Sequence, residues 1–289
     1  ARSPMPSLID IRRRIRSVKS TQQITRAMKL VSSAKLRRAQ DRVLAARPYA
    51  RVFERLLADV ARAARTDERL FHPLLAERQQ ERIQLVLITA DRGLAGAFNS
   101  NLIKAAQKFL ADNQDRRVEL VAVGRKGRDF FRKRDVPVIE EYTGITEKIT
   151  YEHAVAISRG LIQRFSREEI DAVYLLFNEF KSIMSQRLVV NRILPVAAPE
   201  GAQPAEYIYE QPPRQLLERL LPRYVEIAVY HALLESAAAQ QAARMTAMDA
   251  ATTNAAEMID RLTLYMNRVR QASITKEIIE VVSGAAGVE

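Results

Sequence analysis

The chain has 289 residues, 47% of them apolar, and a formal net charge of +12, a composition that fits a folded globular protein. It contains no cysteine, which excludes a disulfide framework, a thiolate nucleophile and a cysteine-based metal site. Its three histidines, His72, His153 and His231, are far apart in the sequence, so we expect no metal site. No apolar run is long enough to span a bilayer, and the N-terminus lacks the apolar segment of a secretory signal.

Both ends of the chain are predicted to form long helices, over about residues 7–60 and 214–286. Neither glycine nor proline occurs in residues 8–46 or 224–282. Heptad-like apolar positions open the two helices, as a two-stranded seam requires: Ile11, Ile15, Val18, Leu217, Leu221, Tyr224 and Ala228. Further along, the expected seam consists mainly of small and polar residues: Thr25, Met28, Ala238, Ala242, Met245, Thr252 and Ala256.

Because both helices leave the same middle region, we expect them to pair antiparallel. Aligning their ends places Met28 opposite the turn from Arg244 to Met248, and Ser7 opposite Asn267, with an error of one or two turns. The part of the second helix beyond Arg268 then has no partner helix.

Positive charge is concentrated in residues 1–60, which hold fifteen Lys and Arg against four Asp and Glu. A basic helix is compatible with nucleic acid, an anionic membrane, an acidic protein or plain solvation. No aromatic residue precedes Tyr49, so base stacking is unavailable, and residues such as Ser17 and Thr21 interrupt the apolar stripe of a membrane-lying helix. An acidic protein partner is favoured, and a solvated basic face remains the alternative.

The middle of the chain, residues 61–213, is predicted to be an open α/β domain. Expected strands and helices alternate along it, with strands at Ile83–Thr89, Val118–Val123, Ala172–Phe177 and Arg187–Leu194 and helices at Ser100–Asp112, Lys126–Arg134 and Tyr151–Arg164. This alternation indicates a mostly parallel sheet. The adjacent carboxylates Glu140-Glu141 and Glu168-Glu169 are expected to be solvated acids outside the strands.

The stretch TADRGLAGAFNSN, residues 89–101, raises the question of a phosphate-binding loop. It offers only Gly93 and Gly96, without a following lysine, whereas a Walker loop or a dinucleotide fingerprint needs more. No acidic residue follows at the distance that a ribose site needs. We therefore expect a tight turn and no nucleotide. Asp91 and Arg92 are expected to form a loop-fixing ion pair, and a role for them in an enzyme site is the alternative. Without a nucleophile elbow or an S-x-x-K motif, the chain is expected to be non-catalytic.

Three stretches taken together resemble the gamma subunit of F-type ATP synthase. They are IRRRIRSVKSTQQITRAMKLVSSAKLRRAQ (11–40), TADRGLAGAFN (89–99) and AARMTAMDAATTNAAEMIDRLTLYMNRVRQASITKEIIEVVSGAAG (242–287). The central loop of that family usually reads T-D-R-G-L-C-G, and Ala95 stands here in the cysteine position.

The resemblance implies a long antiparallel coiled coil, residues 1–60 and 214–289, with an inserted Rossmann-like open α/β foot domain, residues 61–213, that holds no nucleotide. It implies a non-catalytic rotating shaft inside a ring of three α and three β subunits, whose catalytic sites it couples to the ion-driven c ring. The epsilon subunit and the c ring are the expected partners of the foot. No cofactor, metal, nucleic acid or direct membrane insertion is expected.

The resemblance also implies contact residues and a location. Residues expected to face a β subunit are Arg26, Met28, Lys29, Arg244, Arg270 and Gln271, and residues of the foot expected towards epsilon and the c ring are Tyr207, Tyr209 and Glu210. The expected location is peripheral, on the cytoplasmic face of a bacterial inner membrane or, alternatively, the matrix face of the mitochondrial inner membrane. The competing hypothesis is a coiled-coil protein that binds nucleic acid through the basic first helix.

Overall fold

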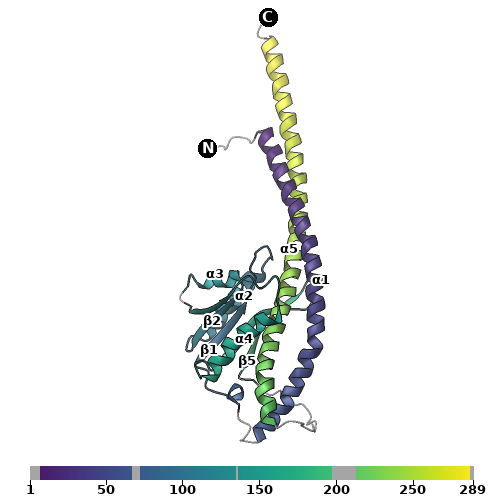
Figure 1. Cartoon of the computed structure of the whole chain (residues 1–289). Coiled ribbons are helices and arrows are strands. Elements are labelled where there is room, and N and C mark those ends of the chain that lie inside the picture. The colour runs from purple at the N-terminus through teal and green to yellow at the C-terminus, as the bar shows by residue number, and fades with distance from the viewer. Residues whose placement is uncertain (1–6, 67–71, 135, 197–212, 287–289) are drawn as a thin grey trace. The chain divides into compact units, whose positions relative to one another are not determined.

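Along the sequence, one long helix precedes the strands of a sheet and another follows them. The computed structural model describes residues 7–66, 72–134, 136–196 and 213–286. Helix α1 spans Leu8–Thr66 and helix α5 spans Pro213–Ala286 (Figure 1). The chain divides into two compact units, one formed by residues up to Val31 and from Met245 onward, the other by Ser32–Arg244. We call them the helical unit and the sheet unit.

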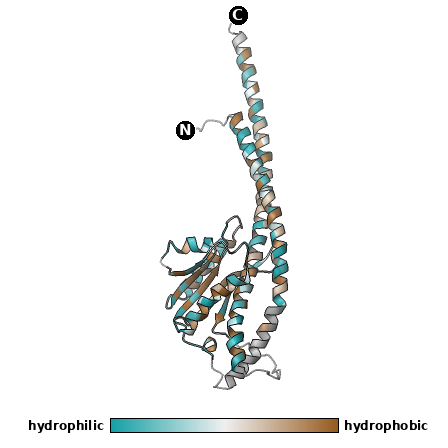
Figure 2. Cartoon of the chain, viewed as in Figure 1, coloured by the Kyte–Doolittle hydropathy of each residue, from teal (hydrophilic) through white to brown (hydrophobic). Residues whose placement is uncertain are grey.

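The sheet unit contains five strands: β1 (Arg82–Ile88), β2 (Arg117–Val123), β3 (Val138–Tyr142), β4 (Ala172–Phe180) and β5 (Gln186–Leu194). Their order is β3-β2-β1-β4-β5, and only β5 runs antiparallel to its neighbour. Strands β1 and β2 are buried at every residue after their first, as expected for strands covered on both faces. Figure 2 shows these strands as the apolar part of the unit. The predicted open α/β fold is confirmed.

Three helices and a short 3-10 helix accompany the strands: α2 (Phe98–Asp112), α3 (Arg125–Phe131), α4 (Tyr151–Ser166) and η2 (Pro73–Leu75). Strand β3 was not predicted, because its five residues are exposed or half-buried and lack a continuous apolar run. The expectation that Glu140 and Glu141 are solvated outside the strands is therefore wrong. Glu140 accepts a 2.8 Å hydrogen bond from the Tyr142 hydroxyl, and Glu141 pairs with Arg132 at 2.7 Å.

Within the helical unit, α1 and α5 pair antiparallel. The Thr25 and Thr252 hydroxyl oxygens are 2.8 Å apart, and the Lys29 ammonium lies 2.6 Å from the Asp249 carboxylate. The register that puts Ser7 opposite Asn267 would place Thr25 about one turn away from Thr252, so the observed register lies within the expected error. The two helices therefore meet through polar side chains at this point. Thr25 of α1 is buried, and its hydroxyl contacts the hydroxyl of Thr252 instead of an aliphatic side chain.

Helix α5 continues beyond the start of α1. Every side chain from Arg270 to Ser283 is exposed except Ser273, which is half-buried. The exposed side chains include five large aliphatic residues, Ile274, Ile278, Ile279, Val281 and Val282. We call residues 270–283 the overhang. Among the described residues, no helix is sufficiently long and apolar to traverse a membrane.

Candidate functional site

The carboxyl edge of the sheet is the first place to look for a site. Strands β1, β2 and β3 extend the sheet in one direction and β4 starts the other, so the topological switch point lies between β1 and β4. Open α/β sheets bind their ligands at the carboxyl ends of the strands at this point. The loop after β1, which contains Gly93 and Gly96, starts there.

At this edge, the hydroxyl group of Thr89, the residue after β1, binds the end of β2 and the start of α3. Thr89 donates a 3.0 Å hydrogen bond from its Oγ1 to the Val123 carbonyl, and the same oxygen accepts a 2.9 Å bond from the Gly127 N–H. Gly124 has φ +88°, and a Cβ there would lie 2.2 Å from the Thr89 carbonyl oxygen. Only glycine therefore allows the turn from β2 into α3 to approach Thr89 so closely.

Asp91 holds three neighbouring segments together. Its carboxylate accepts hydrogen bonds from the N–H groups of Arg125 (3.2 Å), Gly144 (2.9 Å) and Thr146 (3.2 Å), and from the Thr146 hydroxyl at 2.6 Å. Burial alone would raise the pKa of Asp91, but these hydrogen bonds outweigh it and lower the pKa below its ordinary value. The aspartate is thus a structural acceptor for the loops after β2 and β3.

The predicted ion pair between Asp91 and Arg92 is wrong. Arg92 Nε lies 3.1 Å from Glu147 instead, and the Lys35 ammonium of α1 lies 3.4 Å from the second oxygen of the same carboxylate. Neighbouring side chains after a strand diverge to opposite sides, so adjacency in the sequence did not make them partners.

Helix α5 contacts the last residue of β4 and the loop after β1, on the two sides of the switch point. Glu235 accepts a 2.9 Å hydrogen bond from the N–H of Phe180, the last residue of β4. The Arg244 guanidinium lies 3.5 Å from the carbonyl oxygen of Gly93, in the loop after β1. Between these contacts the helix is buried at Ala238, Ala239 and Ala242. The chain's own helix therefore lies at the edge where related sheets bind a ligand.

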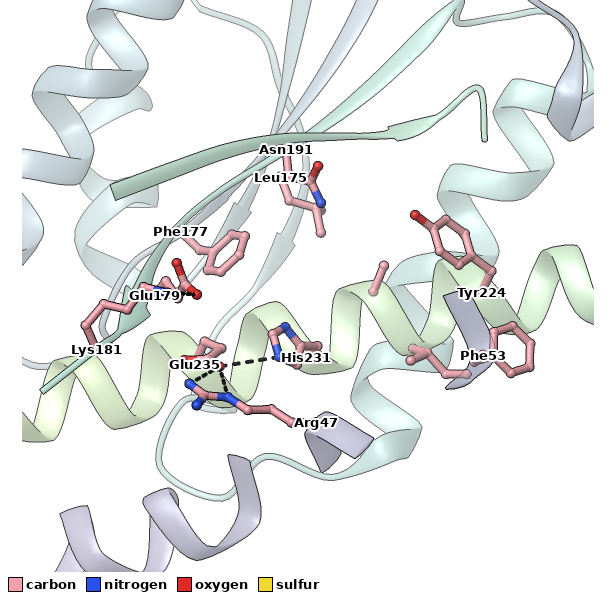
Figure 3. A pocket seen from close by; sticks show the side chains of 12 residues that line it. Arg47, Phe53, Leu175, Phe177, Glu179, Lys181, Asn191, Tyr224, His231 and Glu235 are labelled. Atoms are coloured by element: carbon pink, nitrogen blue, oxygen red, sulfur yellow. Dashed lines mark hydrogen bonds and ion pairs between the residues drawn. The ribbon is translucent and has the colours of Figure 1, made fainter. Parts of the chain in front are cut away.

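Glu235 is the buried centre of an ionic cluster, shown in Figure 3, whose Arg47 and His231 side chains are 32% and 29% exposed. Its side chain is 0% exposed, and Oε1 accepts hydrogen bonds from Arg47 Nε at 3.2 Å and Nη2 at 3.0 Å. The same oxygen lies 3.3 Å from His231 Nε2, while Oε2 takes the Phe180 N–H. Burial would raise the pKa of Glu235, but the bonds from His231, Arg47 and Phe180 lower it below its ordinary value. We call Arg47, Phe180, His231 and Glu235 the junction.

The junction joins α1, β4 and α5, and the sequence analysis did not find it. Arg47 and Glu235 are 188 residues apart, so no local spacing connects them. A signal was present nonetheless: Glu235 is the only charged residue in residues 232–243. A single carboxylate in an apolar helical segment is expected to be paired when that segment is buried.

Two hollows lie in the sheet unit. One, of about 270 Å³, adjoins the junction and is lined by residues that include Arg47, Phe177, Lys181, Tyr224, His231 and Glu235. The other, of about 310 Å³, is strongly basic, and the charged residues that line it are Lys35, Arg38, Arg42, Lys148 and Glu147. The positive charge of the second hollow comes from α1, because the loop before α4 contributes one acid, Glu147, and one base, Lys148.

The structure describes six of the nine expected contact residues. Arg26, Arg270 and Gln271 are exposed, and Met28 and Lys29 are half-buried, with Lys29 paired to Asp249. Arg244 is only 6% exposed, and burial lowers the pKa of its guanidinium. Its side chain contacts the Gly93 carbonyl within the sheet unit, and its expected contact with a β subunit stays a prediction. The remaining three, Tyr207, Tyr209 and Glu210, lie outside the described residues.

The fold and this site define the class of protein. It is an open α/β domain inserted into an antiparallel coiled coil, and the C-terminal helix contacts the carboxyl edge of the sheet. A family model described as ATP synthase matches residues 7–288. The chain is 62% identical over 286 residues to the ATP synthase gamma chain of Solibacter usitatus, covering 99% of this chain and 100% of that one. It is 52% identical over 286 residues to the ATP synthase gamma chain of Anaeromyxobacter sp. (strain Fw109-5), covering 97% and 99%. The chain belongs to the ATP synthase gamma-chain family.

Solved structures share the fold. A chain of the Euglena gracilis mitochondrial ATP synthase structure (OSCP/F1/c-ring, rotational state 3) superposes with a TM-score of 0.70 at 18% identity, covering 97% of this chain and 94% of that one. A chain of the Tetrahymena thermophila mitochondrial ATP synthase structure (central stalk/c-ring) gives a TM-score of 0.61 at 24% identity, covering 79% and 99%. The combination of two long helices with a five-stranded sheet is thus found in distant proteins.

Proposed function

We propose that this chain is the rotating central-stalk subunit of an F-type ATP synthase. It transmits torque between the ion-driven c ring and the catalytic sites on the β subunits, so that ion transport is coupled to ATP synthesis. The observation that carries the proposal is the 62% identity to an ATP synthase gamma chain over 99% of the chain. In functional terms, residues 1–60 and 214–289 form the coiled-coil shaft and residues 61–213 form the foot.

The chain itself is non-catalytic in this proposal, and the nucleotide chemistry belongs to the β subunits. Two observations support this assignment. Helix α5 places Glu235 and Arg244 at the edge of the sheet where a nucleotide would bind. The loop after β1 has neither the lysine nor the glycine spacing of a phosphate loop.

The partner contacts proposed for the helical unit are a ring of three α and three β subunits. Arg26, Met28 and Lys29 on α1 face an acidic β-subunit loop, and Arg270 and Gln271 on α5 form a polar catch against a β subunit. Polar contact residues of this kind support rotation, because deep apolar contacts with the ring would raise the barrier to turning. Charges attract a partner loop over a range of angles, since their interaction falls off slowly with distance.

The exposed overhang supports enclosure by other subunits. Its five aliphatic side chains are between 48% and 72% exposed. A contiguous apolar surface of this kind marks an interaction site in a soluble protein. At the foot, we assign Tyr207, Tyr209 and Glu210 to the epsilon subunit and the c ring. The complex then lies peripherally on the cytoplasmic face of a bacterial inner membrane, or on the matrix face of the mitochondrial inner membrane.

Reconstitution tests the proposal. The chain mixed with the α and β subunits of its own complex is expected to form a stable assembly with ATPase activity. If no assembly forms, the proposal fails. Titration of the isolated chain with duplex DNA examines the competing hypothesis. Saturable binding that weakens steeply with salt, in the absence of any assembly with α and β, would favour a nucleic-acid-binding protein.

A further inference from the structure

A rotor that transmits torque needs a fixed connection between its long helices and its sheet. We call the elements from η2 to β5 the sheet domain. Apolar packing is strong but non-directional, so two surfaces packed only by aliphatic side chains resist separation better than small sliding movements. A buried network of charged hydrogen bonds is directional and fixes one geometry. The sheet unit contains one such network between the sheet and both long helices, namely the junction around Glu235.

The junction engages both carboxylate oxygens of Glu235. Oε1 receives two N–H groups of Arg47, from α1, and Oε2 receives the Phe180 N–H at the end of β4. Arg47 Nη2 also donates to the Phe180 carbonyl at 3.3 Å. Arg47 and Glu235 therefore both bind the same residue of the strand, through its backbone. Figure 3 shows how Glu235 lies between Arg47 and His231. Backbone groups of a strand cannot rotate away as a side chain can.

In the other described polar contacts between these helices and the sheet domain, no charged side chain is as buried as that of Glu235, whose partner Arg47 is itself 32% exposed. The Lys35–Glu147 pair, at 3.4 Å, has side chains that are 41% and 31% exposed. Arg42 donates to the Ile149 carbonyl at 2.6 Å, but in a loop and not in a strand. Water and ions screen exposed pairs, which therefore contribute little rigidity. Among the described residues, Glu235 has the least exposed charged side chain, at 0%.

We propose that Glu235 is a positioning residue for torque transmission: with Arg47 and the backbone of Phe180, it fixes the sheet domain to α1 and α5. This inference rests on the proposed rotor function. Glu235 touches no nucleotide and acts through the stiffness of the connection. Its loss leaves the α and β subunits able to hydrolyse ATP but increases the torsional freedom of the sheet domain relative to the helices.

The test compares two glutamine variants of the full chain in the assembled complex. Glu235→Gln removes the charge of the junction while keeping the size of the side chain. Glu119→Gln is the matched control, because Glu119 is also buried and ion-paired, to Arg164 at 2.6 Å and Arg117 at 2.9 Å, but within the sheet domain. Both variants are expected to lower the melting temperature of the isolated chain, since each disturbs a buried ion pair.

The readout is the angular fluctuation of a probe attached to the sheet domain, recorded while the α and β subunits are immobilised and hydrolysis is blocked. The variance of the angle reports torsional stiffness directly. We expect at least about a twofold larger variance for Glu235→Gln and no change for Glu119→Gln. A merely structural role predicts lower melting temperatures for both variants and equal variances.

Equal variances for wild type and Glu235→Gln would overturn the inference, and so would an equal increase for Glu119→Gln. If Glu235→Gln does not fold, Arg47→Lys replaces it, because lysine keeps the charge but loses the two-pronged bond. The same increase is expected there, and its absence counts equally against the inference. Failure of the wild-type chain to assemble would contradict the proposed function instead, so the two failures are distinguishable.

Discussion

Asp91 shows at the scale of one residue how a motif that suggests chemistry can serve structure. Three of its four hydrogen bonds come from the loop between β3 and α4, and the fourth comes from the first residue of α3. Asp91→Asn is expected to destabilise the chain by about 2–3 kcal/mol, because the amide group presents a donor to N–H groups that need an acceptor. Denaturant unfolding of both proteins measures the difference.

Arg92→Ala is the control for this prediction. Arg92 is 75% exposed in its pair with Glu147, so its loss should change the unfolding free energy by less than about 1 kcal/mol. Equal losses for the two variants would show that Asp91 has no special role.

The effect of Asp91→Asn should also depend on pH. Because the pKa of Asp91 is lowered in the folded chain, its contribution is present above the ordinary value of 3.8 and is lost as pH falls through the folded value. The gap between wild type and variant should therefore be full at neutral pH and shrink below about pH 4.

Substitution of Gly124 and of Gly93 by alanine should affect stability differently, although both residues lie in loops at the same edge of the sheet. A Cβ at Gly124 would lie 2.2 Å from the Thr89 carbonyl oxygen, whereas one at Gly93 would meet only the Lys126 side chain, at 3.8 Å. Gly124→Ala is expected to cost at least about 2 kcal/mol of unfolding free energy, and Gly93→Ala less than about 1 kcal/mol. Thermal unfolding of both variants decides. A larger loss for Gly93→Ala would contradict the described geometry.

At the scale of elements, hydrophobic runs decided what could be predicted. The sequence predicted β1, β2, β4 and β5 because each contains consecutive apolar residues, and it predicted both long helices because glycine and proline are absent from long stretches. Strand β3 was not predicted, because an edge strand buries few side chains and its sequence therefore has the mixed polar and apolar pattern of a loop. The first helix extends to Thr66 rather than to about residue 60, across Pro48. The junction escaped because its partners meet only through the tertiary fold.

The register of α1 against α5 in the helical unit can be tested by disulfide formation. Thr25→Cys with Thr252→Cys should crosslink readily, because the two side-chain oxygens are 2.8 Å apart in the structure. The chain has no cysteine of its own, so any crosslink is unambiguous. A Val18→Cys and Glu280→Cys pair should not crosslink, since Glu280 lies in the overhang. Crosslinking of the second pair but not the first would refute the antiparallel register.

At the scale of the whole molecule, the overhang links the isolated chain to its complex. A single exposed helix of this length is marginally stable in water. Backbone amides of residues 270–283 should therefore exchange rapidly with solvent in the free subunit and become protected in the assembled complex. Hydrogen exchange measured in both states tests this prediction, with the amides of buried β1 as the reference. Strong protection in the free chain would show that the overhang needs no surrounding ring.

Rotation is the central claim, and direct observation tests it. The complex is assembled from this chain with its own α and β subunits, the ring is fixed to a surface, and a probe is attached to the sheet domain. On addition of ATP, the account predicts stepwise rotation in one direction that stops when ATP is removed. A stable, ATP-hydrolysing complex in which the probe stays at one angle would contradict the account.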